Sequence, residues 1–568
     1  MIFAMMGAES KEYDVVILGG GLAGLTLGLQ LKDKRPETSI LILERRENNA
    51  PAAAHKVGES TVELGTHYIR EVLNLKDYLD EFQLPKHGLR FFLSPQHKKD
   101  ITRRVELGPK ERLPVPSHQI DRGIFENDLI KFNREKGNEV IMGASVKNVD
   151  LNEEIHEVSF ELSGALNVVK ARWVTDATGR RSFLKRKLGF SKELDHNINS
   201  AWFRINQVID IDDWSEDEQW KHKLEPGLRR LGTIHLMDTG YWVWIIPLVS
   251  GATSVGIVAD AEIHDFSGFN KFDKAMDWLK EHEPQAYDKI YPMKDDLMDF
   301  KILKHFSYHS GKFYSPERWA VVGEAGAFLD PFYSPGTDFI AYSNTWVTDL
   351  ISRDLDGEDI HLRANVYEQV HNAFIENWLP VYQNKYQLMG NTQVMVAKIT
   401  WDWATYWAIS TLLFTNKGTT DIQLLKKLFA AKDSVLQKLG GLNIKMQQFF
   451  LDWAEKENVP YEDHYLDFFD INFMKEFHTD SENQYRGNDL IEKLRSNMGI
   501  LENIASEIFR RVNQKLNDGQ ANLKVDPYNM TLSGNGENYK DDSLVSPDPA
   551  IIKDVDIFWF SKYPIAIS

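Results

Sequence analysis

The sequence predicts an α/β fold with an inserted antiparallel β-sheet and a mainly α-helical C-terminal extension. Near the N-terminus, the apolar run at 15–18 enters a glycine-rich turn and then an apolar helical stretch, which is typical of a βαβ unit. Short alternating strands appear between about 198 and 308, and the pattern from about 360 to 515 is mostly helical. We therefore expect a discontinuous α/β domain (12–195 and 310–350), an antiparallel-sheet domain (196–309) and a helical region (351–568) with a loop-rich segment at 516–550.

The glycine-rich turn has G-x-G-x-x-G spacing, with glycines at Gly19, Gly21 and Gly24. The first glycine of such a turn allows a tight bend, the second lets the backbone approach a pyrophosphate, and the third lets helix pack on strand. The second strand, 39–43, ends in Glu44, where a carboxylate would meet ribose hydroxyls. The sequence therefore predicts a Rossmann-like dinucleotide site, and the alternative is an ordinary βαβ unit with a glycine turn.

Composition excludes several classes of protein. The formal net charge is −18 and no basic stripe is present, so we expect no nucleic-acid partner. The chain has no cysteine, which excludes disulfides and thiolate chemistry, and nothing suggests a metal site. The apolar opening, residues 1–7, is too short for a signal peptide, and no apolar run reaches a membrane-spanning length. We expect a cytoplasmic protein with no membrane span.

Three later segments complete a pattern with the glycine turn. They are the turn Gly58-Glu59-Ser60-Thr61, the strand end Asp176-Ala177-Thr178-Gly179, and Gly323-Glu324-Ala325. In this order, over residues 12 to about 350, the segments resemble the FAD-binding domain of aromatic hydroxylases of the para-hydroxybenzoate hydroxylase type. The resemblance implies bound FAD, held by Gly19, Gly21, Leu22, Ala23, Gly24, Glu44, Arg45, Lys56, Gly58, Glu59, Ser60, Arg122, Asp176, Gly179, Gly323, Glu324 and Gly336. That family usually has Gly-Asp where this chain has Gly323-Glu324, so the acid is one methylene longer.

A narrower resemblance lies within this one. The run 242–247, Trp-Val-Trp-Ile-Ile-Pro, matches the W-x-W-x-I-P motif of flavin-dependent halogenases. The run 86–91 matches the K-x-G-x-x-F stretch of the halogenases that act on phenols, pyrroles and carrier-bound aryl groups. Residues 57–60 and 330–336 also resemble that branch. The chain therefore resembles the phenol branch of these halogenases more than the tryptophan branch.

The resemblance implies a division of roles. In that family FADH2 and oxygen convert chloride or bromide to hypohalous acid, and a lysine away from the flavin delivers the halogen to the substrate. Lys86 is the expected delivering lysine, and Lys56 is the other candidate for that role. The alternative for Lys86 is that it is an ordinary turn lysine exposed to water. Trp242 and Trp244 are expected to keep substrate off the flavin, or else to pack in a core. Arg122 matches a family arginine near the flavin, with a surface salt bridge as its alternative.

The loop before the long helical run is expected to bind halide and substrate. Gly336 and Thr337 provide backbone amides at a helix start, whereas Pro335 lacks the N–H that the family loop often carries there. Tyr333 takes the place of the glutamate with which tryptophan-type enzymes orient their substrate. The expected substrate is therefore an electron-rich phenol, because loss of its own proton activates the ring.

No second nucleotide-binding unit is visible in the sequence, so the implied partner is a separate NAD(P)H-dependent flavin reductase. The aromatic substrate is expected either free or bound to a carrier protein. Three other readings remain open: a class A FAD monooxygenase that hydroxylates an aromatic compound, a reductase of isoprenoid double bonds, and a flavoprotein without catalytic activity. The hydroxylase should lack the paired indoles and the lysine.

Overall fold

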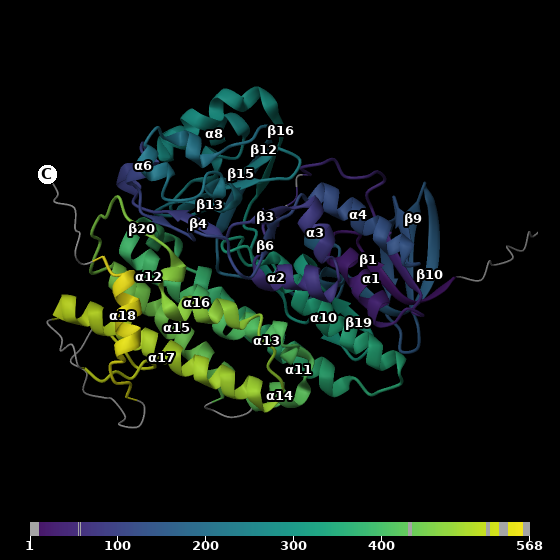
Figure 1. Ribbon diagram of the computed structural model, residues 1–568. Coiled ribbons are helices and arrows are strands. Elements are labelled where there is room, and N and C mark those ends of the chain that lie inside the picture. The colour runs from purple at the N-terminus through teal and green to yellow at the C-terminus, as the bar shows by residue number, and fades with distance from the viewer. Residues whose placement is uncertain are drawn as a thin grey trace, which may run out of the picture.

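The computed structural model describes residues 11–54, 56, 58–429, 434–517, 523–532 and 544–560. Two eight-stranded sheets and a helical C-terminal region are the main parts of the described structure, which also has two two-stranded sheets. Figure 1 shows the glycine-turn sheet on the right, the second sheet at the top, and the C-terminal helices, green to yellow, below it. Parts of the predicted loop-rich segment at 516–550 lie outside the described residues.

The first sheet has the order β18-β19-β10-β1-β2-β7, with β8 and β9 continuing from β10. Its strands are β1 (Glu12–Leu18), β2 (Ile40–Glu44), β7 (Glu139–Met142), β8 (Ser145–Asp150), β9 (His156–Leu162), β10 (Ala165–Asp176), β18 (Tyr314–Ser315) and β19 (Trp319–Val321). β1 runs parallel to both β2 and β10. Helix α1 (Leu22–Lys34) packs beside this sheet and contacts both α4 (Arg122–Glu135) and α10 (Gly336–Leu355). Burial on both faces explains the uninterrupted apolar run at 15–18, and the predicted α/β unit is confirmed.

The second sheet has the order β16-β12-β15-β14-β13-β4-β5-β20. Its strands are β4 (Leu89–Phe92), β5 (Glu106–Leu107), β12 (Ile198–Ile205), β13 (Thr233–Asp238), β14 (Tyr241–Pro247), β15 (Thr253–Asp260), β16 (Leu297–Leu303) and β20 (Tyr465–Leu466). The five strands between residues 198 and 303 are antiparallel, as the alternating pattern predicts. The sheet also includes strands from 89–107 and from 465–466, so it extends beyond the predicted range of 196–309. Such long-range pairing leaves no local sequence signal.

Alternation along β14 gives this strand two different faces. Tyr241, Val243 and Ile245 join the core beneath α8 (Phe272–His282), whereas Trp242 and Trp244 join the core that continues into the rest of the molecule. Successive side chains of a strand point to opposite faces, so a shift of one residue would turn both indoles away. The strand pattern therefore places both indoles toward the interior.

The C-terminal helices surround α12 (Thr392–Thr405), all of whose residues are buried. The others are α11 (His361–Tyr382), α13 (Leu412–Thr415), α14 (Ile422–Phe429), α15 (Val435–Ala454), α16 (Asn472–Asp480), α17 (Asn488–Asn517) and α18 (Pro549–Ile557). Shorter elements of the chain are α2 (Glu63–His67), α3 (Lys76–Phe82), β3 (Leu84–Lys86), β6 (Ser117–Gln119), α5 (Phe183–Lys187), β11 (Ser191–Glu193), α6 (Glu218–Lys221), α7 (Leu228–Leu231), α9 (Pro284–Ile290) and β17 (Tyr308–Ser310).

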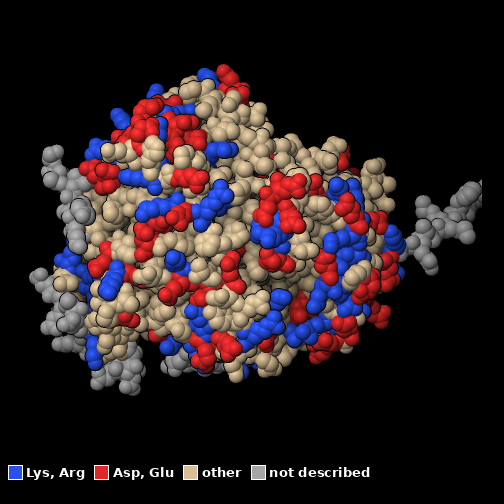
Figure 2. All heavy atoms as spheres, in the orientation of Figure 1, with Lys and Arg blue, Asp and Glu red and all other residues tan. Residues whose placement is uncertain are grey.

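The described residues contain neither a membrane-spanning helix nor a cluster of metal-ligating side chains. Within the ranges given above, no helix combines the length and apolar character needed to cross a membrane. Among the same residues, no group of three or more histidine or carboxylate side chains is arranged to hold a metal ion. On the face drawn in Figure 2, acidic and basic side chains are interspersed.

Candidate active site

Three adjoining cavities connect the glycine turn to Lys86. The first, the dinucleotide cleft, lies beside the glycine turn and is the roomiest of the three, with a volume of about 430 Å³. The second, the indole cavity, has a volume of about 60 Å³ beside Trp242 and Trp244, and it shares Gly58, Glu324, Phe328 and Gly336 with the cleft. The third, the lysine pocket, is narrow, with a volume of about 20 Å³ beside Lys86, and it shares Pro335 with the indole cavity. The indole cavity therefore lies between the other two.

The three glycines of the motif have different structural roles. Gly19 has φ +107°, and a Cβ there would lie 2.4 Å from the carbonyl oxygen of Ala177. A Cβ at Gly24 would lie 2.0 Å from the carbonyl oxygen of Gly19, because helix α1 packs directly on the turn. A Cβ at Gly21 would meet nothing within 4 Å, so it would project into the open cleft. This cradle, with the N-terminus of α1 beside it, fits a pyrophosphate.

Glu44 stabilises the same turn. Its Oε2 accepts a hydrogen bond from the Gly20 amide at 2.8 Å, and its Oε1 accepts one from the Arg46 amide at 2.7 Å. The other predicted cofactor residues that line the cleft are Leu22, Ala23, Arg45, Lys56, Gly58, Arg122, Gly179, Glu324 and Gly336. Gly24 lies beneath the turn, and Ser60 and Gly323 line the indole cavity instead.

Lys56 and Arg122 form one buried ion cluster with Glu126. Arg122 approaches Glu126 to 2.6 Å, and its side chain is 11% exposed, which rules out the surface salt bridge considered as its alternative. Burial lowers the pKa of Lys56 although Glu126 opposes the shift. All three residues line the cleft, so Lys56 lies on the cofactor side and does not reach the lysine pocket.

The carboxylates of Asp176 and Glu59 have partners within the protein. Asp176 accepts hydrogen bonds from the amides of Thr178, at 2.9 Å, and Leu184, at 2.6 Å. Glu59 is buried in an ion pair with Arg204 at 2.6 Å. Asp176 therefore holds the backbone turn after β10, Glu59 is held by a side chain of β12, and their expected contacts to the cofactor stay predictions.

The two indoles of β14 lie side by side in the indole cavity, with ring centroids 5.7 Å apart. Trp244 donates to the hydroxyl of Ser254 at 3.2 Å, and its ring occupies the space over Gly256, where a Cβ would come within 2.2 Å. Trp242 donates to the hydroxyl of Tyr386 at 2.9 Å, and Tyr386 donates onward to Asp330 at 2.9 Å. Both rings are therefore held in fixed positions between the cleft and the lysine pocket.

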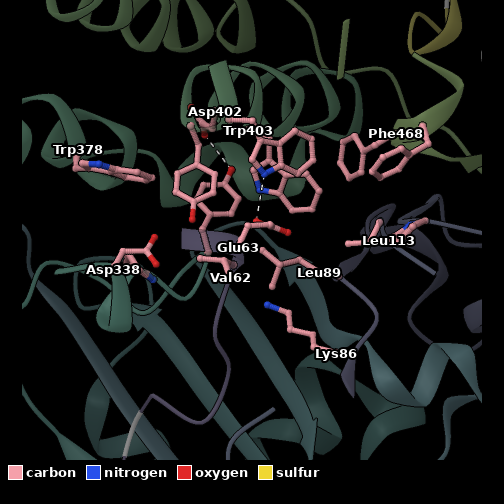
Figure 3. Close-up of a pocket in the computed structure, with 17 residues that line it drawn as sticks. Val62, Glu63, Lys86, Leu89, Leu113, Asp338, Trp378, Asp402, Trp403 and Phe468 are labelled. Carbon is pink, nitrogen blue, oxygen red and sulfur yellow. Dashed lines mark hydrogen bonds between the residues drawn. The ribbon is translucent and has the colours of Figure 1, made fainter. Parts of the chain in front are cut away.

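Lys86 ends β3 and is 5% exposed, so it is not the solvent-exposed turn lysine considered as its alternative. Its Nζ donates a hydrogen bond to the carbonyl oxygen of Thr61 at 2.6 Å. Burial lowers the pKa of Lys86 to about 7, although Glu63 and Asp338 oppose the shift. Figure 3 shows the amine turned toward the pocket. Near neutral pH this lysine is therefore available in both protonation states.

The aromatic wall of the lysine pocket comes from the C-terminal region, for which the sequence suggested no specific role. It consists of Trp378, Trp403, Tyr406, Trp407, Phe468 and Phe469. Tyr333, the predicted substrate residue, lies in the same pocket and donates from its hydroxyl to Asp402 at 2.9 Å. The aromatic content of 12%, with 15 tryptophans, and the Trp-Asp-Trp run at 401–403 were the available signals for this wall.

The predicted halide loop connects the cavities. Tyr333 and Ser334 have φ of +70° and +60°, a left-handed conformation that costs energy in residues other than glycine. Helix α10 begins at Gly336, which lines both the cleft and the indole cavity, and Thr337 lines the cleft. The Ser334 hydroxyl donates to that of Ser60 at 3.1 Å. The first amides of α10 thus lie at the junction of the cleft and the indole cavity, where an anion would be stabilised.

Comparisons with known proteins agree with this geometry. A family model described as "FAD binding domain" matches residues 12–248. The flavin-dependent halogenase chlA of Dictyostelium discoideum is 27% identical over 509 residues, covering 80% of this chain and 82% of that protein. The 1H-pyrrole-2-carbonyl-[peptidyl-carrier protein] chlorinase of Pseudomonas fluorescens is 25% identical over 399 residues, covering 67% of this chain and 85% of that protein.

The chain is thus similar to flavin-dependent halogenases over most of its length. Its fold is also that of a solved halogenase. The crystal structure of halogenase PltM superposes with a TM-score of 0.64 at 17% identity, covering 85% of this chain and 96% of that one. The predictions of the halogenase family, of FAD as cofactor and of an enzyme are therefore confirmed. The roles of individual site residues stay predictions.

Proposed function

We propose that this halogenase installs chlorine or bromine on an electron-rich phenol, through hypohalous acid and Lys86. The observation that supports this most directly is the place of Lys86. A buried lysine whose pKa is lowered to about 7 lies in an aromatic pocket, and two fixed indoles stand between that pocket and the dinucleotide cleft. Such an arrangement suits transfer of an electrophile to a ring that never reaches the cofactor.

FAD would be held by the residues of the dinucleotide cleft. The glycine turn and the start of α1 would bind the pyrophosphate, and Lys56 and Arg122 would line the same cleft. As FADH2 with oxygen, the cofactor supplies the oxidising equivalent that turns halide into hypohalous acid. The proposed supplier of FADH2 is a separate NAD(P)H-dependent flavin reductase.

The backbone amides of Gly336 and Thr337 would stabilise the halide. They begin a 20-residue helix, so the positive end of its dipole adds to their hydrogen bonds. Pro335 has no amide hydrogen to contribute. The bulk of Trp242 and Trp244 would keep the aromatic substrate away from the cofactor, and this would prevent direct hydroxylation of the substrate.

Lys86 would then deliver the halogen in one of two ways. The protonated amine donates a hydrogen bond to the oxygen of hypohalous acid and thereby polarises it toward the ring. The neutral amine takes the halogen to form a haloamine, and the displaced hydroxide takes the amine proton and leaves as water. Burial of Lys86 favours the neutral form.

The phenolic substrate is supported by Tyr333 and by a structural relative. Tyr333 stands where a glutamate would orient tryptophan, so an activated ring is needed. Halogenase PltM has been solved in complex with phloroglucinol and FAD, with a TM-score of 0.63 at 17% identity to this chain. A carrier-bound aryl substrate is the second candidate, because two relatives are named for pyrrole groups on a peptidyl-carrier protein.

The test is reconstitution. Purified protein is given FAD, a flavin reductase, NADH, oxygen, bromide or chloride and a panel of free phenols, and products are examined by mass spectrometry. A halide-dependent mass shift on a free phenol supports the proposal. Halide-independent hydroxylated product would establish the aromatic hydroxylase instead. Product formed only from pyrrole or phenol thioesters of a carrier protein would establish the second candidate.

A further inference from the structure

The halide loop, residues 330–335, leads directly into α10 and has a strained backbone at two consecutive residues. Tyr333 and Ser334 both have positive φ, and neither is a glycine. A native protein keeps such a conformation where surrounding contacts hold it, and residues of this kind gather at functional sites. The contacts that hold this loop are therefore of interest for the site.

Contacts within the loop account for part of its shape. The Phe332 amide donates to Oδ1 of Asp330 at 2.8 Å, and the Ser334 amide donates to the carbonyl oxygen of Pro331 at 2.9 Å. The Ser334 hydroxyl donates to that of Ser60 at 3.1 Å. These contacts bend the loop and attach it to the turn at 58–61.

The C-terminal region holds the loop at a first point, through the hydroxyl of Tyr386. This hydroxyl donates to Oδ2 of Asp330 at 2.9 Å and accepts from the indole N–H of Trp242 at 2.9 Å. The carbonyl oxygen of Tyr386 accepts from the Gly240 amide at 2.9 Å, which fixes the tyrosine beside the turn between β13 and β14. His196 lies 2.7 Å from the same oxygen of Asp330. One hydroxyl therefore connects the loop to an indole of the barrier.

The C-terminal region holds the loop at a second point, through Asp402 of α12. Its Oδ2 accepts from the hydroxyl of Tyr333 at 2.9 Å, and its Oδ1 accepts from Gln447 of α15 at 2.6 Å. Lys398, one turn earlier in α12, pairs with the same carboxylate. Figure 3 shows Asp402 on the helical side of the lysine pocket, across from Lys86. A strained residue of the loop is thus bonded to a carboxylate that two other side chains hold in place.

The two contacts run in opposite directions. At Asp330 the loop supplies the carboxylate, whereas at Tyr333 it supplies the hydroxyl, and all four partners are buried. Burial raises the pKa of Tyr333 and of Tyr386, so both hydroxyls keep their protons and act as donors. Hydrogen bonds to an ionised group are about twice as strong as those between neutral groups. Each contact is therefore a firm restraint on the loop.

We propose that the C-terminal region positions the halide loop, and that Tyr386 and Asp402 are positioning residues for halide oxidation. This inference rests on the proposed function, because it takes the first amides of α10 as the halide site. Tyr333 stands three residues before Gly336, so a displaced loop would move the start of α10. Tyr386 and Asp402 are not among the described residues that line the dinucleotide cleft, so FAD binding should not depend on them.

The test removes one hydroxyl at a time, in Tyr386→Phe and in Tyr333→Phe. Each variant keeps the ring and loses one contact, and each carboxylate keeps its other partners. Hypobromous acid is measured with monochlorodimedone as the trap, so neither a phenol nor the delivering lysine affects the result. We expect the KM for bromide to rise about tenfold in each variant, with unchanged FAD affinity.

The matched control is Tyr241→Phe. Tyr241 directly precedes Trp242 in β14, is equally buried, and donates from its hydroxyl to Glu283 at 3.0 Å on the opposite face of the strand. The same kind of contact is lost there, away from the loop. We expect a lower thermal midpoint and an unchanged KM for bromide. A rise in KM equal to that of the two loop variants would trace the effect to general destabilisation and overturn the proposal.

Hydrogen exchange provides a measurement that does not depend on halide chemistry. Peptides covering 330–337 should exchange faster in both loop variants than in wild type, and at the wild-type rate in Tyr241→Phe. Unchanged exchange in the loop variants would overturn the inference, and faster exchange with an unchanged KM would refute the role in halide oxidation. If one loop variant fails to fold, the other decides.

The same measurements separate this inference from the proposed function. Wild-type protein that forms no hypohalous acid from either halide would refute the proposed function, and the exchange rates would still decide whether the C-terminal region holds the loop. Wild-type protein that forms hypohalous acid, together with loop variants of unchanged KM and exchange, would refute the inference alone.

Discussion

The amine of Lys86 donates its hydrogen bond to a backbone carbonyl, that of Thr61, at 2.6 Å. A carbonyl can be served by a neutral amine as well as by an ammonium, whereas an adjacent carboxylate would hold the proton on the lysine. Thr61 directly precedes Val62, the N-cap of α2, and Glu63, the first residue of that helix. The start of α2 therefore fixes the position of the carbonyl that Lys86 contacts. The contact is therefore compatible with both proposed forms of halogen delivery.

Lys86→Ala should abolish halogenation of the phenol and leave hypohalous acid production intact. The dinucleotide cleft and the halide amides do not involve Lys86, so halide oxidation should continue. The measurement pairs product analysis with chlorination of monochlorodimedone, a trap for free hypohalous acid. Lys99→Ala, at an exposed lysine, is the control. Wild-type yields of halogenated phenol from Lys86→Ala would refute the assigned role.

The stability of the protein should depend on pH through Lys86. Because burial lowers its pKa from 10.5 to about 7, the unfolded chain holds a proton that the folded chain lacks between these values. The free energy of unfolding should therefore rise with pH in this range, by up to about 1.4 kcal/mol per pH unit. Below pH 7 the destabilisation caused by burying the charged lysine is complete. Relative to Lys86→Met, the thermal midpoint of the wild type should increase from pH 7 to pH 10.

Titration of Asp338 changes the stability in the opposite direction, and it therefore limits the pH range in which the effect of Lys86 can be measured. Burial raises the pKa of Asp338 to about 8, so its contribution to stability is lost as pH rises from 3.8 to about 8. Both proteins carry Asp338, and the range above pH 8 isolates the lysine. A constant difference in thermal midpoint between pH 8 and pH 10 would show that Lys86 titrates normally.

Gly256→Ala should displace the indole of Trp244. The new Cβ would lie 2.2 Å from the ring, which has to leave its place over β15. We expect less halogenated product per FADH2 consumed, and hydroxylated product where the ring opens a path to the cofactor. Gly499→Ala is the control, since a Cβ there meets nothing within 4 Å and alanine favours the helix by about 1 kcal/mol. Equal coupling in both variants would argue against the barrier role.

Gly21 and Gly24 should respond differently to the same substitution. A Cβ at Gly24 would lie 2.0 Å from the Gly19 carbonyl oxygen, so Gly24→Ala must move α1 and should lower the thermal midpoint without FAD. A Cβ at Gly21 meets no protein atom within 4 Å. Gly21→Ala should therefore fold normally and bind FAD more weakly, as measured by titration. Normal FAD affinity in Gly21→Ala would contradict the proposed place of the pyrophosphate.

Local patterns were sufficient to predict much of this protein. The apolar run at 15–18 and the spacing of Gly19, Gly21 and Gly24 depend only on neighbouring residues, as does the alternation that puts Trp242 and Trp244 on one face of a strand. These short-range rules led to the α/β unit, the antiparallel strands and a dinucleotide site. Resemblance to a family then implied FAD as the cofactor and brought Lys86 and Tyr333 forward as candidates.

The tertiary structure decided which of these candidates meet, and how each is charged. Pro85 and Gly88 favour an exposed turn for Lys86, yet the folded protein buries this lysine, and burial lowers its pKa. The pocket beside it is lined by Trp403 and Phe468, more than 300 residues later in the chain. The carboxylate of Asp176 accepts from backbone amides, Glu59 pairs with Arg204, and Asp338 reaches the lysine pocket from α10. Burial and charge depend on atoms brought together from distant parts of the chain, so no local pattern reports them.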